Sequence, residues 1–210
     1  MTLRLLDLYC CQGGASAGFA AAGFDVTGVD LHPQPRYPYR FVRGDAIAYL
    51  LEHGHEYDLV AASPPCQRYT NAQRLRGNDH PDLIGPTREA ILRVGRPGVI
   101  ENVGGARAEL RDPVLLCGPM LGVATYRHRW FETVGDWSLP QLPHPPHDVP
   151  QAKMGRPVPE GWYGQYVGNF TGVARAREVL GVPWMSRDGI RECIPPAYAE
   201  WIGRQFIAAQ

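Results

Sequence analysis

The chain has 210 residues, of which 44% are hydrophobic, a composition typical of a globular protein rather than a disordered one. Its 21 basic and 21 acidic residues cancel, which excludes coating of nucleic acid by bulk positive charge but not a local basic face. The cysteines match neither zinc spacing nor a secreted disulfide scaffold, and no apolar run could span a membrane, so we expect a cytoplasmic protein with reduced thiols.

Apolar runs and helical patterns alternate through the first half of the chain. We expect buried strands at residues 3–9, 25–30, 57–62 and 98–103, and helices at 15–22, 46–52 (with Asp45 as N-cap) and 88–94. Strands that alternate with helices predict an α/β fold with a doubly wound, mostly parallel sheet. In such sheets ligands bind beyond the carboxyl ends of the strands.

The second half of the chain changes character at residues 133–172, which are rich in proline, glycine and aromatic residues. The prolines exclude long regular elements, and the aromatic residues favour an ordered binding loop. Helices are expected again at 175–180 and 196–207, the latter with proline in its first turn. We therefore predict a catalytic domain made of residues 1–132 and 173–210, with 133–172 as a small recognition segment.

Chemistry-bearing residues follow each of the buried strands. A glycine turn after the first strand can admit a cofactor, and Asp30 ends the next strand where an acid can bind ribose, although a tight structural turn is an equal alternative. Cys66 follows the third strand behind two prolines and is either a nucleophile or an inert buried thiol. Glu101 ends the fourth strand, in the same expected cleft, where burial would raise its pKa and let it donate a proton.

Arg127 and Arg129 share one face if they lie in a strand. Paired guanidinium groups suit a base carbonyl, a phosphate or a nearby acid, although a pair of surface arginines is the commoner case. His144 and His147 have no cysteine or acid at metal-ligand spacing, so we expect loop residues and no metal. Cys117 is expected to be a packing thiol.

In order and spacing these motifs resemble those of the DNA (cytosine-5) methyltransferases. The match comprises the turn at 7–14, Pro65-Cys66, the Glu-Asn-Val run at 101–103 and Arg127-x-Arg129, and it extends to residues 175–184 and 193–199. The resemblance covers roughly residues 4–132 and 173–208. It implies a Rossmann-like methyltransferase fold with S-adenosylmethionine as methyl donor, S-adenosylhomocysteine as product and DNA as partner.

The resemblance also implies roles for individual residues. Cys66 adds to C6 of a flipped-out or unpaired cytosine, while Glu101 protonates or hydrogen-bonds N3. Arg129 binds O2, and Arg127 holds Glu101. The cofactor is expected against Asp7, Tyr9, Cys10, Cys11, Gln12, Gly13, Gly14, Asp30, Leu31, Asp45, Ala46, Pro65, Glu192 and Cys193. The DNA is expected against Ser63, Pro64, Gln67, Arg68, Arg74, Arg76 and Asn102, with residues 67–80 as a loop that closes over the base or, alternatively, a solvated loop.

The chain departs from the family pattern at several positions. Cys11 replaces the first glycine of the cofactor turn, Tyr9 replaces phenylalanine, and Arg191-Glu192 replaces a Gly-Asn pair. Only about 40 residues separate Phe131 from the penultimate motif, far fewer than the family's usual recognition region. So small a segment reads few base edges, which predicts a target of two to four bases, or unpaired or distorted DNA.

Three alternatives stay open at this point. The same chemistry could act on RNA, the chain could be a catalytically silent DNA-binding or accessory protein, or Cys11 and Glu192 could signal a different cofactor or transferred group. The compact size favours a monomeric, solitary phage or bacterial enzyme over half of a restriction system.

Overall fold

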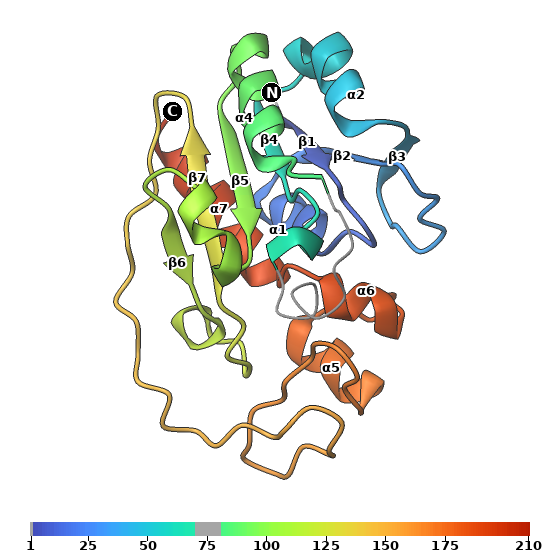
Figure 1. The fold of residues 1–210 in the computed structure, drawn as a ribbon, viewed down its shortest axis with the longest axis vertical. Coiled ribbons are helices and arrows are strands. Elements are labelled where there is room, and N and C mark those ends of the chain that lie inside the picture. Colours follow the sequence, from blue (N-terminus) through green and yellow to red (C-terminus); the bar gives the residue numbers. More distant parts are fainter. Residues whose placement is uncertain (1, 70–80) are drawn as a thin grey trace.

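A single mixed sheet organises the structure, a computed structural model that describes residues 2–69 and 81–210. Its strand order is β3-β2-β1-β4-β5-β7-β6 (Figure 1). The strands are β1 (Arg4–Leu8), β2 (Asp25–Asp30), β3 (Arg40–Arg43), β4 (Leu59–Ala62), β5 (Gly98–Asn102), β6 (Val114–Leu116) and β7 (Arg129–Val134). The first five are parallel, and β7 runs antiparallel to both of its neighbours. The predicted α/β class and mostly parallel sheet are confirmed.

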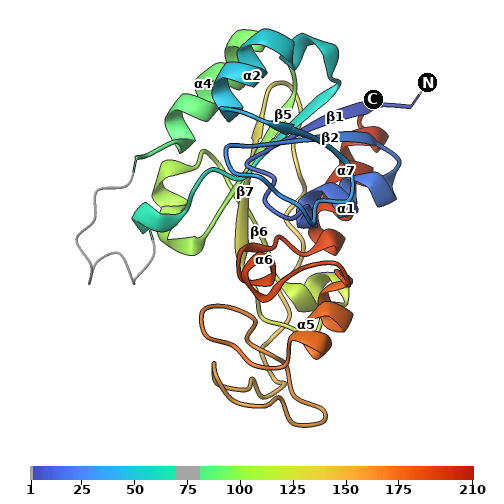
Figure 2. The same cartoon turned by 90° about the vertical axis from the view of Figure 1, so that its right-hand side faces the viewer.

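Helices cover both faces of this sheet. They are α1 (Gly14–Ala22), α2 (Ala46–His53), α4 (Ile84–Val94), α5 (Val173–Leu180), α6 (Arg187–Glu192) and α7 (Pro196–Ala208). Helices α1 and α7 lie on one side of the sheet and α2 and α4 on the other, while α5 and α6 lie beyond it (Figure 2). Within the described ranges no helix combines the length and apolar character that a bilayer crossing requires.

The alternation of side chains along β1 shows why helices are needed on both faces. Leu5 packs with Phe19 and Phe206 on the α1–α7 side, whereas Leu6 packs with Leu50 and Ile91 on the α2–α4 side. Both leucines are fully buried. A strand covered on both faces reads as a continuous apolar run, which is the signal that predicted it.

Some elements were missed or misplaced by the sequence analysis. It assigned no strand to β3 or β6 and no helix to α6, because edge strands and a six-residue helix have no room for a periodic pattern. The condition under which Arg127 and Arg129 would share one strand face is not met, because β7 begins at Arg129 and Arg127 lies in the loop before it. The N-cap at Asp45 is confirmed, since its carboxylate accepts a hydrogen bond from Ala48 N at 2.8 Å.

Residues 135–172 run as irregular chain past β6 and β7 and return beneath α5 (Figure 1). The described chain forms no helix or strand there, only an isolated bridge between Gln151 and Tyr163, as the prolines predict. Tyr166 and Phe170 are buried in a third apolar cluster with residues of α5 and α6, whereas Trp162 is exposed. The segment is therefore anchored by part of its aromatic content.

Helices α1 and α7 approach so closely that their contact requires glycine. A methyl group on Gly18 of α1 would lie 2.0 Å from the carbonyl oxygen of Pro196 and 2.7 Å from Cβ of Ala199. Real Cβ atoms do not come that close to backbone, so a larger residue would force the two helices apart.

We expect Gly18→Ala to lower the free energy of unfolding by about 1–3 kcal/mol, because overpacking outweighs the helical propensity gained. Gly44→Ala is the matched control, since Gly44 has open space around its Cα and no positive φ, and we expect it to stay within about 0.5 kcal/mol of wild type. Urea denaturation measures both. Equal stability of the two variants would refute the close contact.

Candidate active site

A cavity of about 400 Å³ opens at the carboxyl ends of β1, β2, β4 and β5. This is the size of a small-molecule site, at the place where parallel sheets bind ligands. Its walls contain most residues that sequence analysis selected: Asp7, Tyr9, Cys10, Cys11, Gln12, Gly14, Asp30, Leu31, Asp45, Ala46, Ser63, Pro64, Pro65, Cys66, Gln67, Glu101, Arg129, Glu192 and Cys193. The structure thus joins the predicted cofactor turn and the predicted catalytic residues in one space.

The other selected residues lie elsewhere. Gly13 is the N-cap of α1 with φ 82° and does not line the cavity. Arg68 is exposed, and Asn102 and Arg127 are buried beside the cavity rather than in its wall. Arg74 and Arg76 lie outside the described residues. The cavity wall also contains residues that the sequence analysis did not select as site residues: Ala15, His32, Gln34, Leu83, Val103, Met185, Gly189, Arg191 and Ile194. Val103, Arg191 and Ile194 lie in or beside the matched motifs, whereas the others carry no motif and reach the cavity through the path of the chain.

The turn after β1 is held by the acid at the end of β2. The two carboxylate oxygens of Asp30 accept hydrogen bonds from Cys11 N at 3.0 Å and from His32 N at 2.9 Å. Cys11 has φ 47° and Tyr9 has φ 59°, the left-handed region that normally favours glycine. Asp30 therefore stabilises a strained turn in addition to facing the cavity, a role that the sequence analysis did not foresee.

The same turn is joined to the segment before α6. The side-chain oxygen of Gln12 accepts a hydrogen bond from Ser186 N at 2.8 Å, and its amide nitrogen donates to the Ser186 hydroxyl at 2.9 Å. Trp184 Nε1 donates to the carbonyl oxygen of Gln12 at 2.7 Å. These bonds connect residues more than 170 positions apart and close one side of the cavity.

Two departures from the family pattern contact each other across this junction. The Cys11 thiol donates to Glu192 Oε2 at 3.6 Å. Burial, followed by the charge of Glu192, raises the pKa of Cys11 well above its usual value, so the thiol stays protonated and can donate. Cys11 and Glu192 thus form one contact beside the turn after β1.

Several acidic side chains line the half of the cavity near the turn after β1. Asp7 at the end of β1 is buried, and its carboxylate accepts a hydrogen bond from Ser16 of α1. Burial raises the pKa of Asp7 to about 7, and Ser16 opposes that rise. Asp30, Asp45 and Glu192 line the same space, so a ligand that carries positive charge is favoured there.

The loop that carries Cys66 is fixed by Asn102 at the end of β5. Asn102 Nδ2 donates to the carbonyl oxygen of Pro64 at 3.0 Å, and its Oδ1 accepts from Val103 N at 2.9 Å. Asn102 therefore positions the loop that carries Cys66 instead of forming the cavity wall. The Cys66 thiol is partly exposed to the cavity.

Two neighbouring charges act on the Cys66 thiol in opposite directions. Burial, then the negative charge of Glu101, raises the pKa of Cys66, whereas the positive charge of Arg129 lowers it. The net effect is a rise, so the thiol is mainly protonated at neutral pH. Arg129 is the group that limits this rise in the pKa of Cys66.

Glu101 pairs with Arg129, and not with Arg127 as expected from the resemblance. Arg129 Nε lies 2.8 Å from Glu101 Oε1, and both side chains are about nine-tenths buried. The contact is an ion pair without hydrogen-bond geometry, so Oε1 has no hydrogen-bond partner among the described residues. Burial raises the pKa of Glu101, against the opposing charges of Arg129 and Arg127 and a hydrogen bond from Ser63. A buried carboxyl oxygen with spare hydrogen-bonding capacity at a cavity suits a polar ligand.

Arg127 instead links three separate parts of the chain. Its guanidinium group donates to the carbonyl oxygens of Tyr166 at 3.0 Å and Arg191 at 2.6 Å, and its own carbonyl accepts from the Tyr198 hydroxyl at 2.6 Å. Burial and the charge of Arg129 lower the pKa of Arg127 to about 10, which leaves it charged at neutral pH. Its role in this structure is to position the segments around the site.

Comparison with solved structures places the whole chain in one fold. A DNA modification methyltransferase encoded within an Escherichia coli prophage is 16% identical, with 99% of each chain covered and a TM-score of 0.67. The Dnmt2 methyltransferase of Schizosaccharomyces pombe is 14% identical, again with 99% of each chain covered and a TM-score of 0.63. The methyltransferase EhMeth of Entamoeba histolytica is 11% identical, with 100% of this chain and 99% of that chain covered and a TM-score of 0.59.

Sequence comparisons add no closer relative, since no family model and no curated protein sequence matches the chain. At these identities the structural likeness establishes the fold and leaves the reaction to be argued from the site. The chain has, over nearly its whole length, the Rossmann-like fold of these methyltransferase structures.

Proposed function

We propose that this protein transfers a methyl group from S-adenosylmethionine to C5 of cytosine in DNA. The observation that carries the proposal is the meeting of Cys66, Glu101 and Arg129 in one cavity with the glycine turn. Cys66 lies in the loop after β4, Glu101 near the end of β5 and Arg129 at the start of β7. Such a set unites a nucleophile, a proton donor and an anchor for a carbonyl oxygen.

Cytosine C5 is a poor nucleophile until C6 carries an added group. The Cys66 thiolate would form an S–C6 bond, and the C5=C6 electron pair would move toward C5. Glu101, whose pKa is raised by burial, would hold a proton at N3 and remove the negative charge that addition places on the ring. Arg129 would donate to O2. C5 would then form a bond to the methyl carbon of S-adenosylmethionine as the sulfur–methyl bond breaks, with S-adenosylhomocysteine as the leaving group. Loss of the C5 proton to solvent, return of the N3 proton to Glu101 and departure of the Cys66 thiolate would restore the ring.

The residues present fit the proposed cofactor. S-adenosylmethionine would supply an electrophilic methyl group on a positively charged sulfur. Asp30, Asp45 and Glu192 give the half of the cavity near the turn after β1 a negative character that favours such a ligand, and Asp7, with a pKa raised to about 7, adds part of a charge. The turn between β1 and α1 faces the same space, with backbone N–H groups at the start of a helix.

The polynucleotide partner follows from the chemistry of the base. A cytosine inside a stacked duplex cannot reach Cys66, so the base must be flipped out or unpaired. DNA is favoured over RNA by the prophage DNA modification methyltransferase, whose chain this one matches over nearly its full length. Residues 133–172 are proposed as the recognition segment, and their small size supports a target of two to four bases.

Incubation with S-adenosylmethionine and unmodified DNA should yield 5-methylcytosine, read by nucleoside mass spectrometry, and Cys66→Ala should abolish it. Single- and double-stranded DNA and transfer RNA are tested in parallel. Product on RNA alone would reassign the substrate. No product on any of the three nucleic acids would instead favour a catalytically silent binding protein or a different methyl donor.

Trapping on DNA that contains 5-fluorocytosine separates these outcomes further. Fluorine at C5 cannot leave as a proton does, so a covalent protein–DNA adduct should accumulate with wild type and be absent with Cys66→Ala. DNA with ordinary cytosine is the control. An adduct that persists in Cys66→Ala would assign the nucleophile to another residue.

Glu101→Gln should separate the acid from the nucleophile. Removing the negative charge beside Cys66 takes away a cause of its raised pKa, so more thiolate forms at a given pH. We expect alkylation of Cys66 by iodoacetamide at pH 7.5 to speed up by roughly three- to tenfold, while methylation falls by about 100-fold or more.

Alkylation is followed at the Cys66 peptide by mass spectrometry. For wild type the rate should still be rising with pH above the ordinary cysteine pKa, because a raised pKa moves thiolate formation to higher pH. Glu109→Gln, a change of the same type at an exposed acid, is the matched control and should leave both rates unchanged. Slower alkylation in Glu101→Gln would contradict the proposed electrostatics.

A further inference from the structure

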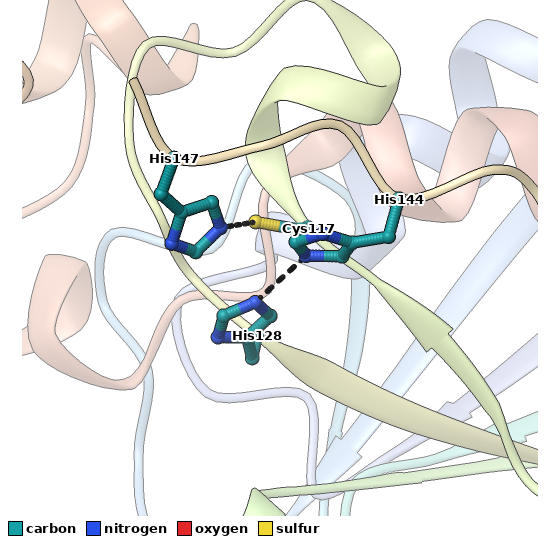
Figure 3. A group of neighbouring side chains, drawn as sticks. All are labelled: Cys117, His128, His144 and His147. Atoms are coloured by element: carbon teal, nitrogen blue, oxygen red, sulfur yellow. Dashed lines mark hydrogen bonds between the residues drawn. The ribbon is translucent and has the colours of Figure 1, made fainter. Parts of the chain in front are cut away.

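Four potential metal ligands meet outside the cavity, where the irregular segment passes β6 and β7. Cys117 follows β6, His128 directly precedes β7, and His144 and His147 come from the extended chain (Figure 3). One ligand atom of each residue lies within 4.8 Å of those of the other three. Their nearest pairs are Cys117 Sγ and His147 Nε2 at 3.5 Å, and His128 Nε2 and His144 Nε2 at 3.0 Å.

This cluster adds partners that sequence spacing did not reveal. His144 and His147 have no cysteine or acid close to them in the chain, which favoured loop residues and no metal. The fold supplies the missing partners from 16 and 30 positions away, in His128 and Cys117. Cys117 is thus buried and also within reach of a histidine nitrogen.

The spacing of the ligand atoms fits tetrahedral zinc. Zn–N bonds of about 2.05 Å and a Zn–S bond of about 2.3 Å place neighbouring ligand atoms about 3.4 Å apart for two nitrogens and about 3.6 Å for nitrogen and sulfur. The pairs found at 3.0 Å and 3.5 Å lie close to these values. Small side-chain adjustments would bring all four atoms around one ion.

The donor set also selects the metal. One thiolate and three imidazoles suit a borderline-soft divalent ion such as Zn²⁺, and do not suit Mg²⁺ or Ca²⁺, which prefer oxygen. Four protein ligands fill a tetrahedral shell and leave no position for water, which is the pattern of a structural site rather than a catalytic one.

Contacts around the cluster hold the ligand loop in place. The Tyr126 hydroxyl donates to the carbonyl oxygen of Val149 and accepts from Val149 N, both at 2.9 Å. The ring of His147 stacks on Tyr126, with centroids 3.7 Å apart. Gln141 bonds the backbone of Leu115 in β6, accepting from its N at 3.1 Å and donating to its O at 3.2 Å. The chain is thus held at Gln141 and at Val149, on either side of His144 and His147. Contacts of this kind orient the ligands of a metal site.

We propose that Cys117, His128, His144 and His147 bind one structural Zn²⁺ ion that fastens the first part of the 133–172 segment to the sheet. The His128 carbonyl oxygen also accepts a hydrogen bond from Arg129 Nη1 at 2.8 Å. The ion would therefore stabilise the chain that positions a cavity residue. The site is independent of the proposed reaction and can be tested without it.

The untagged full chain, grown with added zinc and dialysed against metal-free buffer, should retain roughly one zinc per protein by mass spectrometry of the metal. The double variant His144→Asn/His147→Asn should retain less than about a tenth of that, because only two ligands remain. Both side chains are exposed, so the fold should survive the change. His55→Asn, at an exposed histidine of the turn at Gly54–Glu56, is the matched control and should retain the full content.

Cobalt replacement tests the ligand identity. Co²⁺ in the wild-type protein should give the intense visible absorption of a tetrahedral site and a thiolate charge-transfer band. Cys117→Ser should lose that band, whereas Cys66→Ser should keep it. Metal-free wild type with no tetrahedral cobalt spectrum, or full zinc content in the double histidine variant, would overturn the proposal.

The structural role has its own measurement. Removing zinc with a chelator should speed amide hydrogen exchange in residues 139–150 by more than about tenfold and leave β1 and β4 unchanged. Unchanged exchange at 139–150 in a chain shown to have lost its zinc would contradict the fastening role.

Discussion

The buried guanidinium group of Arg127 is the interaction on which the arrangement around the cavity depends. It connects the loop before β7 to Tyr166 in the irregular segment and to Arg191 at the end of α6, while its own carbonyl receives Tyr198 of α7. Tyr166 and Arg127 are buried, so their carbonyl groups would otherwise be acceptors in need of a donor. Burying a positive charge costs free energy unless polar groups compensate it, and here carbonyl oxygens do so. The arginine and the three segments therefore stabilise one another.

The neighbouring arginine works by charge rather than by cross-linking. Glu101 works against a Cys66 thiolate, because its negative charge raises the pKa of the thiol, whereas a thiolate is stabilised by a positive neighbour. From one position Arg129 lowers the pKa of Cys66 and compensates the charge of Glu101, with its Nε 2.8 Å from Glu101 Oε1. A binding event that shifts Arg129 toward a ligand would weaken its pairing with Glu101, raise the proton affinity of that carboxyl and so prepare it to donate.

The irregular segment shows how nearly forty residues keep a defined path without helices or strands. Backbone ladders are absent from its described length, so its order rests on a few anchors of different kinds. Arg127 holds the carbonyl of Tyr166, the rings of Tyr166 and Phe170 enter the third apolar cluster, and the proposed metal site would fix the end nearest β7. Discrete anchors suit a surface that presents loops in one arrangement. The anchors fix the path of the chain, and the sequence between them can vary.

Local pattern determined the framework and much of the cavity. The paired leucines of β1, the N-cap at Asp45 and a cysteine placed directly after a buried strand all depend on neighbours a few positions away, and sequence alone predicted them. Contacts between Cys11 and Glu192, and between Cys117 and His147, were decided only by the tertiary structure. They join residues 181 and 30 positions apart, and such pairs depend on the path of the whole chain, which no short-range periodicity records.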